Sequence, residues 1–418
     1  MLKILPPLFI SLLFAARAFA EPKIITFDAA VGPAEQARVV ASRGGKIIKE
    51  FPFINAVLAD FPENVRAADM ARTPGVSGAE DDLEIYWLAV EENAVRLETA
   101  QALAQALLEG AHPAAEPPAV STPVAPPQPP VYVSTANAEG KVDHMPWSVA
   151  RLRAPQAWAA AKGAGARVAV LDTGVDCAHP DLAPNCAPGY NVFNPGALPA
   201  DDKGHGTHVA GIIAGALNWR GMVGLAPEAA ILPVKVLDSS GSGKISEIID
   251  GIGWAVRNRV DIINMSLGAP KHSEAQSRAV KAARDAGVLV ICAAGNDAGP
   301  VNYPAAYPDA VAVTSLDFSS KLAKSSSRGP ETDFATPGVR IYSAAPGGSF
   351  ALMSGTSQAA PHISGMAALA VSLGVKGPEA IRAALVKASV DLGLPPEEQG
   401  AGAPVASRLV ANILALSK

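Results

Sequence analysis

Residues 168–174 read Val-Ala-Val-Leu-Asp-Thr-Gly, a short apolar run that ends in a carboxylate and a glycine turn. Similar apolar runs alternate with helical stretches through the second half of the chain. The runs lie at 231–237, 262–265 and 288–293, and the helical stretches at 208–216, 245–258 and 273–286. Buried strands alternating with helices favour an α/β domain with a parallel sheet covered on both faces. Because such sheets bind ligands beyond the carboxyl ends of their strands, we expect reactive residues directly after strands.

The composition supports a large folded core. Of the 418 residues, 49% are hydrophobic and 17% are charged, which excludes disorder over the whole chain. The net charge is −5 and no basic tract occurs, so nucleic acid is excluded as a partner. The length favours two domains joined by a linker.

The N-terminus has the pattern of an export signal. Lys3 precedes an apolar run at 4–16, and Ala18-Phe19-Ala20 matches a small-x-small cleavage site. The run is shorter than the ~20 residues that a membrane-spanning helix needs, and no other stretch is long and apolar enough. We therefore expect residues 1–20 to be removed. The mature protein is then secreted or periplasmic, without membrane contact.

The expected export bears on the pairing of the three cysteines. Export permits disulfides, and Cys177 and Cys186 lie nine positions apart on one loop, so we expect a bridge between them. Cys292 lies in an apolar run and reads as a buried free thiol. The alternative is three free cysteines.

Residues 21–90 form a first unit with the order β-α-β-β-α-β, which predicts a small ferredoxin-like α+β domain. We expect strands at 23–27, within 46–58 and at 83–90, and helices at 33–42 and 64–72. Residues 91–141 follow as a helix at 95–108 and a Pro-rich linker at 113–130. The second domain then spans 142–418.

Three residues of this second domain could form a nucleophilic site. Asp172 follows a strand, His205 begins a helix between glycines, and Ser357 begins another helix. Each alone has a commoner explanation, such as a helix cap. A metal pair with His208 is the rival interpretation, but the glutamate of a zinc-protease motif is missing, so His208 reads as a core residue.

The segments that carry these residues resemble the motifs of the subtilisin-like serine proteases (subtilases). The matches are Val-Ala-Val-Leu-Asp-Thr-Gly-Val-Asp at 168–176, Gly-His-Gly-Thr-His-Val-Ala-Gly at 204–211 and Ser-Gly-Thr-Ser-x-Ala-Ala-Pro-His at 354–362. Their order, Asp then His then Ser, is the one known for subtilisin. The resemblance covers about residues 143–415 and implies a three-layer domain with a mainly parallel central sheet. The first domain is similar in pattern to the family's inhibitory propeptide.

The resemblance also assigns candidate roles around the site. Ser357 becomes the nucleophile, His205 the base, Asp172 its orienting partner and Asn296 the side-chain donor of the oxyanion hole. Ten residues match the family's substrate-binding segments. Two edges, between which an extended substrate would pair its backbone, are Gly241, Ser242 and Gly243, and Ser266, Leu267 and Gly268. The P1 pocket would be lined by Ala293, Ala294 and Gly295, with Asn302 near its base.

Calcium is the one metal that the resemblance suggests. Asp181, Asn218 and Asp143 match side-chain ligands of a family calcium site, with carbonyls of Ala216, Arg220 and Met222 completing it. The alternative is a loop held by its own hydrogen bonds.

The sequence thus predicts a secreted serine endopeptidase that acts through an acyl-enzyme at Ser357 and is made as an autoprocessed zymogen. No cofactor is expected for the chemistry. Its expected partners are protein or peptide substrates and its own propeptide domain, and we expect a monomer. The alternatives are a maturation protease dedicated to one substrate and a non-catalytic peptide-binding relative.

Overall fold

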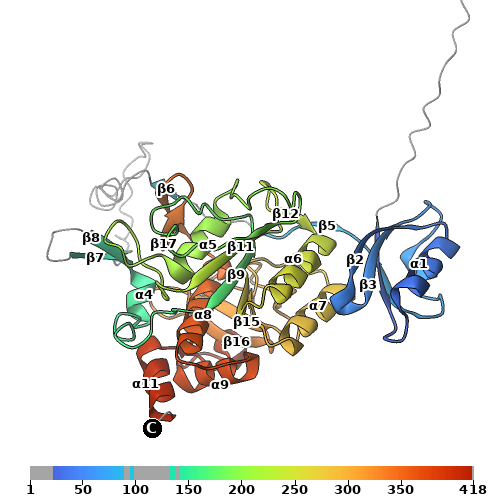
Figure 1. Cartoon of the computed structure of the whole chain (residues 1–418). Helices are drawn as coiled ribbons and strands as arrows, with labels where there is room; N and C mark the ends of the chain where they lie inside the picture. The colour runs from blue at the N-terminus through green and yellow to red at the C-terminus, as the bar shows by residue number, and fades with distance from the viewer. Residues whose placement is uncertain (1–21, 89–94, 98–131, 137–141, 417–418) are drawn as a thin grey trace, which may run out of the picture. The chain divides into compact units, whose positions relative to one another are not determined.

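The computed structural model describes residues 22–88, 95–97, 132–136 and 142–416, with only the backbone described at 95–97, 133–136 and 142. The chain divides into a small unit, Met1–Asp82, and a large unit, Leu83–Lys418, each of which is described by itself (Figure 1). The expected signal and the Pro-rich run at 113–130 lie outside the described residues.

The small unit contains a four-stranded antiparallel sheet in the order β2-β3-β1-β4. This strand order confirms the expected ferredoxin-like domain. Its core gathers apolar residues such as Ile25 and Val57 of the sheet with Val40 of the first helix. The elements are β1 (Lys23–Phe27), α1 (Pro33–Ser42), β2 (Lys46–Phe51), a 3₁₀ turn at Pro52–Ile54, β3 (Ala56–Asp60), α2 (Ala67–Met70) and β4 (Val76–Asp81).

Two expected boundaries of this unit are wrong. The last strand of the sheet is β4 and not residues 83–90, and the helix expected at 64–72 is only the single turn α2. The physical reason is a turn at Pro74 and Gly75: Gly75 has φ of +82° and the Val76 amide bonds back to the Thr73 carbonyl. This turn ends the helix and starts the strand earlier than the apolar pattern suggested.

The large unit is built on a seven-stranded sheet in the order β10-β11-β9-β13-β14-β15-β16. Every pairing in it is parallel, as the alternating strand and helix pattern predicted. The strands are β9 (Arg167–Asp172), β10 (Tyr190–Asn191), β11 (Ala230–Lys235), β13 (Ile262–Met265), β14 (Leu289–Ala293), β15 (Val311–Leu316) and β16 (Thr332–Pro337).

Helices cover both faces of this sheet (Figure 1). Val168 and Val170 of β9 join a buried cluster with Ala359 of α8, whereas Leu171 faces Gly251 of α6. Alternate residues of one strand therefore face different helices, which makes the fold three-layered. The helices are α4 (Trp147–Arg151), α5 (His205–Ala214), α6 (Ile245–Arg257), α7 (Glu274–Asp285), α8 (Thr356–Ser372), α9 (Pro378–Ala388), α10 (Pro396–Gln399) and α11 (Ala406–Leu416). Within the described ranges, no helix is long and apolar enough to span a membrane.

Smaller sheets complete the large unit. β18 (Ser349–Met353) lies between β17 (Ile341–Ala345) and β6 (Val95–Leu97), and β12 (Ser242–Lys244) pairs with β5 (Glu84–Tyr86). The other pairs are β7 (Tyr132–Ala136) with β8 (Val142–Pro146) and β19 (Ser389–Val390) with β20 (Ala403–Pro404). The helix expected from residue 95 is therefore wrong for its first three residues, because their backbone pairs with β18. The rest of that helix lies outside the described residues.

The loop after β9 is closed by a disulfide. Cys177 and Cys186 are bonded, with their Cα atoms 5.7 Å apart, and Cys292 is a buried free thiol on β14. Burial raises the pKa of the Cys292 thiol, which keeps it protonated and unreactive.

Replacing both bonded cysteines, Cys177→Ser with Cys186→Ser, is expected to lower the free energy of unfolding by about 2–3 kcal/mol, because the unfolded chain gains freedom in that loop. The measurement is thermal unfolding with and without reductant, in a background that carries Ser357→Ala at the expected nucleophile. Reductant should lower the melting temperature of the parent and of a Cys292→Ala control, but not that of the double variant. An equal effect on all three would contradict the prediction.

Candidate active site

The first contact of the site joins the end of β9 to the start of α5. The Nδ1–H of His205 donates to Oδ1 of Asp172 at 2.7 Å, and both side chains are buried. The Thr173 amide donates to the same carboxylate oxygen at 2.7 Å. A carboxylate in this position fixes the histidine tautomer, leaves Nε2 to accept a proton, and stabilises the charged ring.

A second carboxylate, Asp201, holds the start of α5. Its Oδ1 accepts from the Thr173 hydroxyl at 2.8 Å and from the Gly204 amide at 2.8 Å. Its Oδ2 accepts from the Thr207 amide at 2.9 Å. These bonds fix the helix turn that carries His205. Sequence reasoning missed Asp201, although its position just before the Gly-His-Gly motif is a typical capping signal.

Ser357 lies in the first turn of α8, next to the end of β13. Its hydroxyl donates to the Ser266 carbonyl at 3.1 Å, and the Ser266 hydroxyl donates back to the Ser357 carbonyl at 2.8 Å. β13 pairs with β9 in parallel register, so Ser266 and Asp172 leave the sheet at the same edge. The structure therefore brings the three sequence-predicted residues to one edge of the sheet.

Asn264 is a further polar residue that sequence reasoning missed. It is fully buried in β13, where its Nδ2 donates to Ser266 and its Oδ1 accepts from Ser364 of α8. It therefore ties the strand to the helix that carries Ser357. One sequence signal could have identified it: Asn264 is the one amide side chain in an otherwise apolar strand. Because a buried polar group needs hydrogen-bond partners, such a residue is expected to bond to neighbouring elements.

Asn296 follows β14 and faces the start of α8. Its Oδ1 accepts from the Thr356 amide at 2.8 Å and from the Thr356 hydroxyl at 3.0 Å. With the oxygen committed in this way, Nδ2 is the group left to donate elsewhere. A side chain at Gly355 would come within 2.9 Å of that nitrogen, so the close approach requires glycine.

The expected peptide-binding edges hold an extended segment of the chain itself. β5 pairs antiparallel with β12, in the register Tyr86 opposite Ser242 and Ile85 opposite Gly243. Trp87 continues this segment: its amide donates to the Gly241 carbonyl at 3.1 Å, and its carbonyl accepts from the Gly268 amide at 3.0 Å. Residues 84–87 therefore lie between the two predicted edges. Leu267, between Ser266 and Gly268, is buried.

The residues expected around the P1 pocket, which takes the side chain before the scissile bond, lie together. The Asn302 amide donates to the Ala294 carbonyl at 2.8 Å, and Asn302 Nδ2 would contact a side chain at Gly295. Ala293 ends β14 directly before them. Asn302 Nδ2 also donates to Oδ2 of Asp297 at 2.7 Å. This acidic neighbour of Asn302 was not predicted from the sequence, because the contact depends on how the loop folds back.

The residues expected to hold calcium gather at one loop. The amides of Trp219 and Arg220 both donate to the buried Asp143 carboxylate at 2.9 Å, and the Met222 amide donates to Oδ2 of Asp181 at 2.8 Å. Oδ1 of Asp181 is buried, and no described residue lies within hydrogen-bond geometry of it. Burial raises the pKa of Asp181, and the charge of Asp143 acts in the same direction. Asn218 accepts from Arg220 and donates to the Pro180 carbonyl.

Two further histidines are buried near the site. Nε2 of His208 lies 3.1 Å from the Ile341 carbonyl, and Nδ1 of His362 lies 2.9 Å from the Gln358 carbonyl. Burial lowers the pKa of His208 to about 3 and that of His362 to about 4. The core placement predicted for His208 is confirmed.

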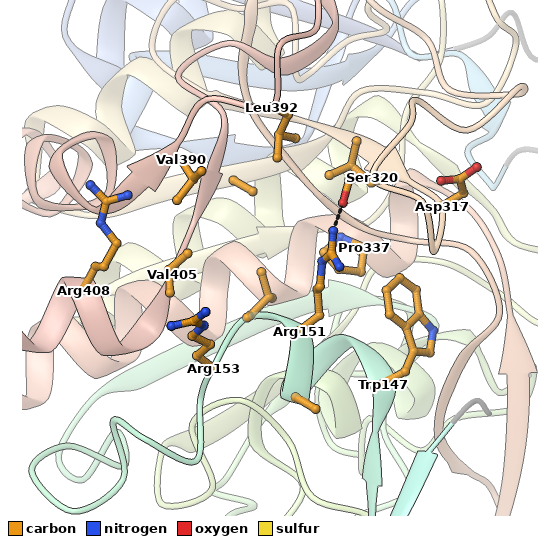
Figure 2. Close-up of a pocket in the computed structure, with 14 residues that line it drawn as sticks. Trp147, Arg151, Arg153, Asp317, Ser320, Pro337, Val390, Leu392, Val405 and Arg408 are labelled. Carbon is orange, nitrogen blue, oxygen red and sulfur yellow. Dashed lines mark hydrogen bonds between the residues drawn. The ribbon is translucent and has the colours of Figure 1, made fainter. Parts of the chain in front are cut away.

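A separate hollow of about 500 Å³ opens between α4, α11 and the loop that follows β15 (Figure 2). Arg151, Arg153 and Arg408 line it, and Figure 2 shows Arg151 bonded to the hydroxyl of Ser320. None of its lining residues is one of the predicted site residues. This hollow is therefore distinct from the edge of the sheet that carries Asp172 and Ser357.

Comparison with known proteins agrees with this geometry. Residues 163–402, more than half of the chain, match the model of the subtilase family. The chain is 35% identical to subtilisin E of Bacillus subtilis (strain 168) over 350 residues, which cover 82% of this chain and 77% of that protein. The chain belongs to the subtilase family.

Other relatives differ in their named location. The intracellular serine protease of Paenibacillus polymyxa is 40% identical, over 63% of this chain and 86% of its own. The minor extracellular protease Epr of Bacillus subtilis (strain 168) is 44% identical, over 53% of this chain and 35% of its own. This subtilase is thus a serine endopeptidase that acts on protein substrates, with the three-layer fold of its family.

The buried histidines predict a loss of stability in acid. In the folded subtilase both stay neutral, whereas in the unfolded chain they bind protons below about pH 6.5. The free energy of unfolding therefore keeps its full value above that pH and decreases as the pH falls toward 4. The decrease is about 1.4 kcal/mol per pH unit for each histidine. Urea unfolding of Ser357→Ala protein between pH 7 and pH 4.5 measures this slope.

His362→Gln should reduce the slope by about the share of one histidine. His272 is exposed, so His272→Gln serves as the matched control and should leave the slope unchanged. If His362→Gln has the same slope as its parent, the assignment of a buried neutral histidine is wrong.

Proposed function

We propose that this subtilase is an exported endopeptidase made as a zymogen, with Ser357 as nucleophile, His205 as base and Asp172 as the residue that orients the base. The observation that carries the proposal is the 2.7 Å contact between Asp172 and His205 at the sheet edge where Ser357 also lies. The family assignment supports the same roles.

The chemistry proceeds in two half-reactions. The Ser357 hydroxyl turns from the Ser266 carbonyl toward Nε2 of His205, transfers its proton there and attacks the scissile carbonyl carbon. The protonated His205 then gives its proton to the leaving amine, and an acyl-enzyme remains on Ser357. Water, deprotonated by His205, releases the acid product and restores the hydroxyl.

Asn296 is proposed to stabilise the tetrahedral intermediate. Because its Oδ1 accepts from Thr356, its Nδ2 can donate to the negative oxygen together with the Ser357 amide. Such a donor acts more strongly on the transition state than on the substrate carbonyl, and loss of one costs about 10²- to 10³-fold in kcat.

The zymogen proposal is supported by the segment in the substrate groove. Residues 84–87 pair with Gly241, Gly243 and Gly268, the positions proposed to hold the backbone of a substrate. The side chains of Trp87 and Leu88 are buried there, and Trp87 Nε1 donates to the Gly243 carbonyl at 2.8 Å. A chain in this position blocks substrate entry until it is cut and released. The domain limits at residues 90 and 141 remain predictions.

Export is supported by two features. The N-terminal pattern at residues 1–20 matches a cleavable signal, and the Cys177–Cys186 disulfide is typical of an oxidising compartment. One relative is named as extracellular.

The proposal predicts that a fluorophosphonate probe labels the mature enzyme covalently and that Ser357→Ala abolishes labelling. In subtilisin, loss of the nucleophile costs about 10⁶-fold in kcat, so the variant should have no measurable peptidase activity. It should also accumulate as a precursor that retains residues 21–90, because self-cleavage requires the same serine. Mass spectrometry of purified protein measures both the label and the N-terminus.

Asn296→Ala is the matched control, since it weakens the oxyanion hole and leaves Ser357 in place. It should retain labelling at a reduced rate. A wild type that does not react would favour the non-catalytic alternative, and normal processing of Ser357→Ala would disprove self-cleavage. A library of peptides then separates a general protease from one dedicated to a single substrate.

We further propose that Asp143, Asp181 and Asn218, with the carbonyls of three loop residues, hold a structural calcium ion. Two buried carboxylates repel each other, and a divalent cation between them would remove that repulsion. The carbonyls belong to Ala216, Arg220 and Met222.

Calcium removal is therefore expected to destabilise the protein. A ligand at 100 times its Kd stabilises the folded state by about 2.7 kcal/mol, so a chelator should lower the melting temperature of Ser357→Ala protein by several degrees. Asp181→Asn should abolish the response, and Asp285→Asn, at an exposed position, should keep it. Equal melting temperatures with calcium and chelator would disprove the site.

A further inference from the structure

β18 carries an added strand that the proposed mechanism does not use. β6 pairs antiparallel with β18, with Val95 opposite Leu352, Arg96 opposite Ala351 and Leu97 opposite Phe350. β17 pairs with the other side of β18. Among the described residues β6 thus forms one outer strand of a three-stranded sheet, and β18 would be the edge without it.

The direction of this pairing relates it to the nucleophile. β18 leads within a few residues to Ser357, so Leu352 is its paired position nearest the nucleophile and Phe350 the farthest. Because the pairing is antiparallel, the segment that enters opposite Leu352 runs away from Ser357 as it proceeds to Leu97. The part of a bound substrate that follows the scissile bond would run in this same direction, away from Ser357.

The preceding segment pairs with a different strand. Residues 84–87 run along β12 in the groove proposed to hold the substrate before the scissile bond. Only seven peptide units separate Leu88 from Val95, which limits their separation to about 25 Å. One stretch of chain therefore pairs first with β12, in the groove proposed for the substrate before the scissile bond, and then with β18, the strand that leads to the nucleophile.

We propose that the free edge of β18 is a binding strand for the part of a substrate that follows the scissile bond, and that residues 95–97 occupy it in the precursor. The proposal rests on the proposed function of Ser357. The site takes extended polypeptide backbone by strand addition, as an exposed sheet edge with unpaired amide and carbonyl groups does. Substrates that extend about seven or more residues beyond the position of Leu88 would engage it.

The arrangement has a consequence for activation. A cut between Leu88 and Val95 would free the groove on the β12 side and leave residues 95–97 attached to the protease at β18. This tethered strand would compete with long substrates at high effective concentration. Full activity on long polypeptides would then need the strand to be displaced or removed by a second cut further along the chain.

The first test compares peptides copied from the chain, residues 83–92 and residues 83–100, as substrates of one enzyme. The enzyme carries Val95→Pro and Arg96→Pro, which remove two amides and stop its own segment from pairing. A third peptide, 83–100 with N-methyl groups at the positions of residues 95–97, keeps the side chains but cannot add as a strand. We expect kcat/KM to be about tenfold higher for 83–100 than for either other peptide, since two or three backbone hydrogen bonds are at stake.

The outcomes separate this inference from the proposal on which it rests. Equal hydrolysis of all three peptides overturns the β18 site and leaves the protease assignment intact. If no peptide is hydrolysed and the fluorophosphonate probe does not react, the proposed function itself fails, and the β18 site fails with it.

The second test measures hydrogen exchange in the full-length Ser357→Ala precursor. Amides of Phe350–Leu352 that bond to β6 should exchange at least tenfold faster after Val95→Pro and Arg96→Pro. Ala114→Pro with Ala115→Pro, in the Pro-rich run, is the matched control and should leave that exchange unchanged. Unchanged exchange in the β6 variant would show that residues 95–97 do not occupy the edge and would overturn the proposal.

Discussion

The parallel pairing of β9 with its two neighbours is the constraint on which the site depends. β9 is in register with β11 on one side and with β13 on the other, so the three strands end at a common edge. Asp172 is the last residue of β9, and Ser266 directly follows β13. A slip of one residue in either pairing would turn these side chains to the opposite face.

Buried hydrogen bonds then convert this common edge into a site with fixed side-chain orientations. Asp201 holds the helix turn of His205, Asn264 joins β13 to α8, and Asn296 is fixed by Thr356. Polar groups in a dry interior are costly without partners, so each bond both satisfies a group and removes a rotational freedom. The resulting rigidity is what electrostatic stabilisation of a transition state requires.

The same backbone chemistry holds two short segments of the chain against the large unit. β5 adds to β12 and β6 adds to β18, each by antiparallel pairing that depends little on side chains. A protease that recognises extended backbone in this way also recognises its own chain, which is tethered and therefore always at high effective concentration. The proposed control by the precursor segment would thus be a direct physical result of this recognition mode.

The sequence alone determined the elements whose signals are local. Apolar runs at 168–171 and 262–265 predicted buried parallel strands, and the resemblance of the motifs to those of subtilases predicted the contact of Asp172 with His205. The tertiary structure alone decided features that depend on distant partners. Residues 95–97 have a helix-like pattern but form the strand β6, because their backbone pairs with the edge of β18. Asp297 accepts a hydrogen bond from Asn302 because the loop between them folds back. Local periodicity cannot report such pairings, since their free energy comes from groups far away in the chain.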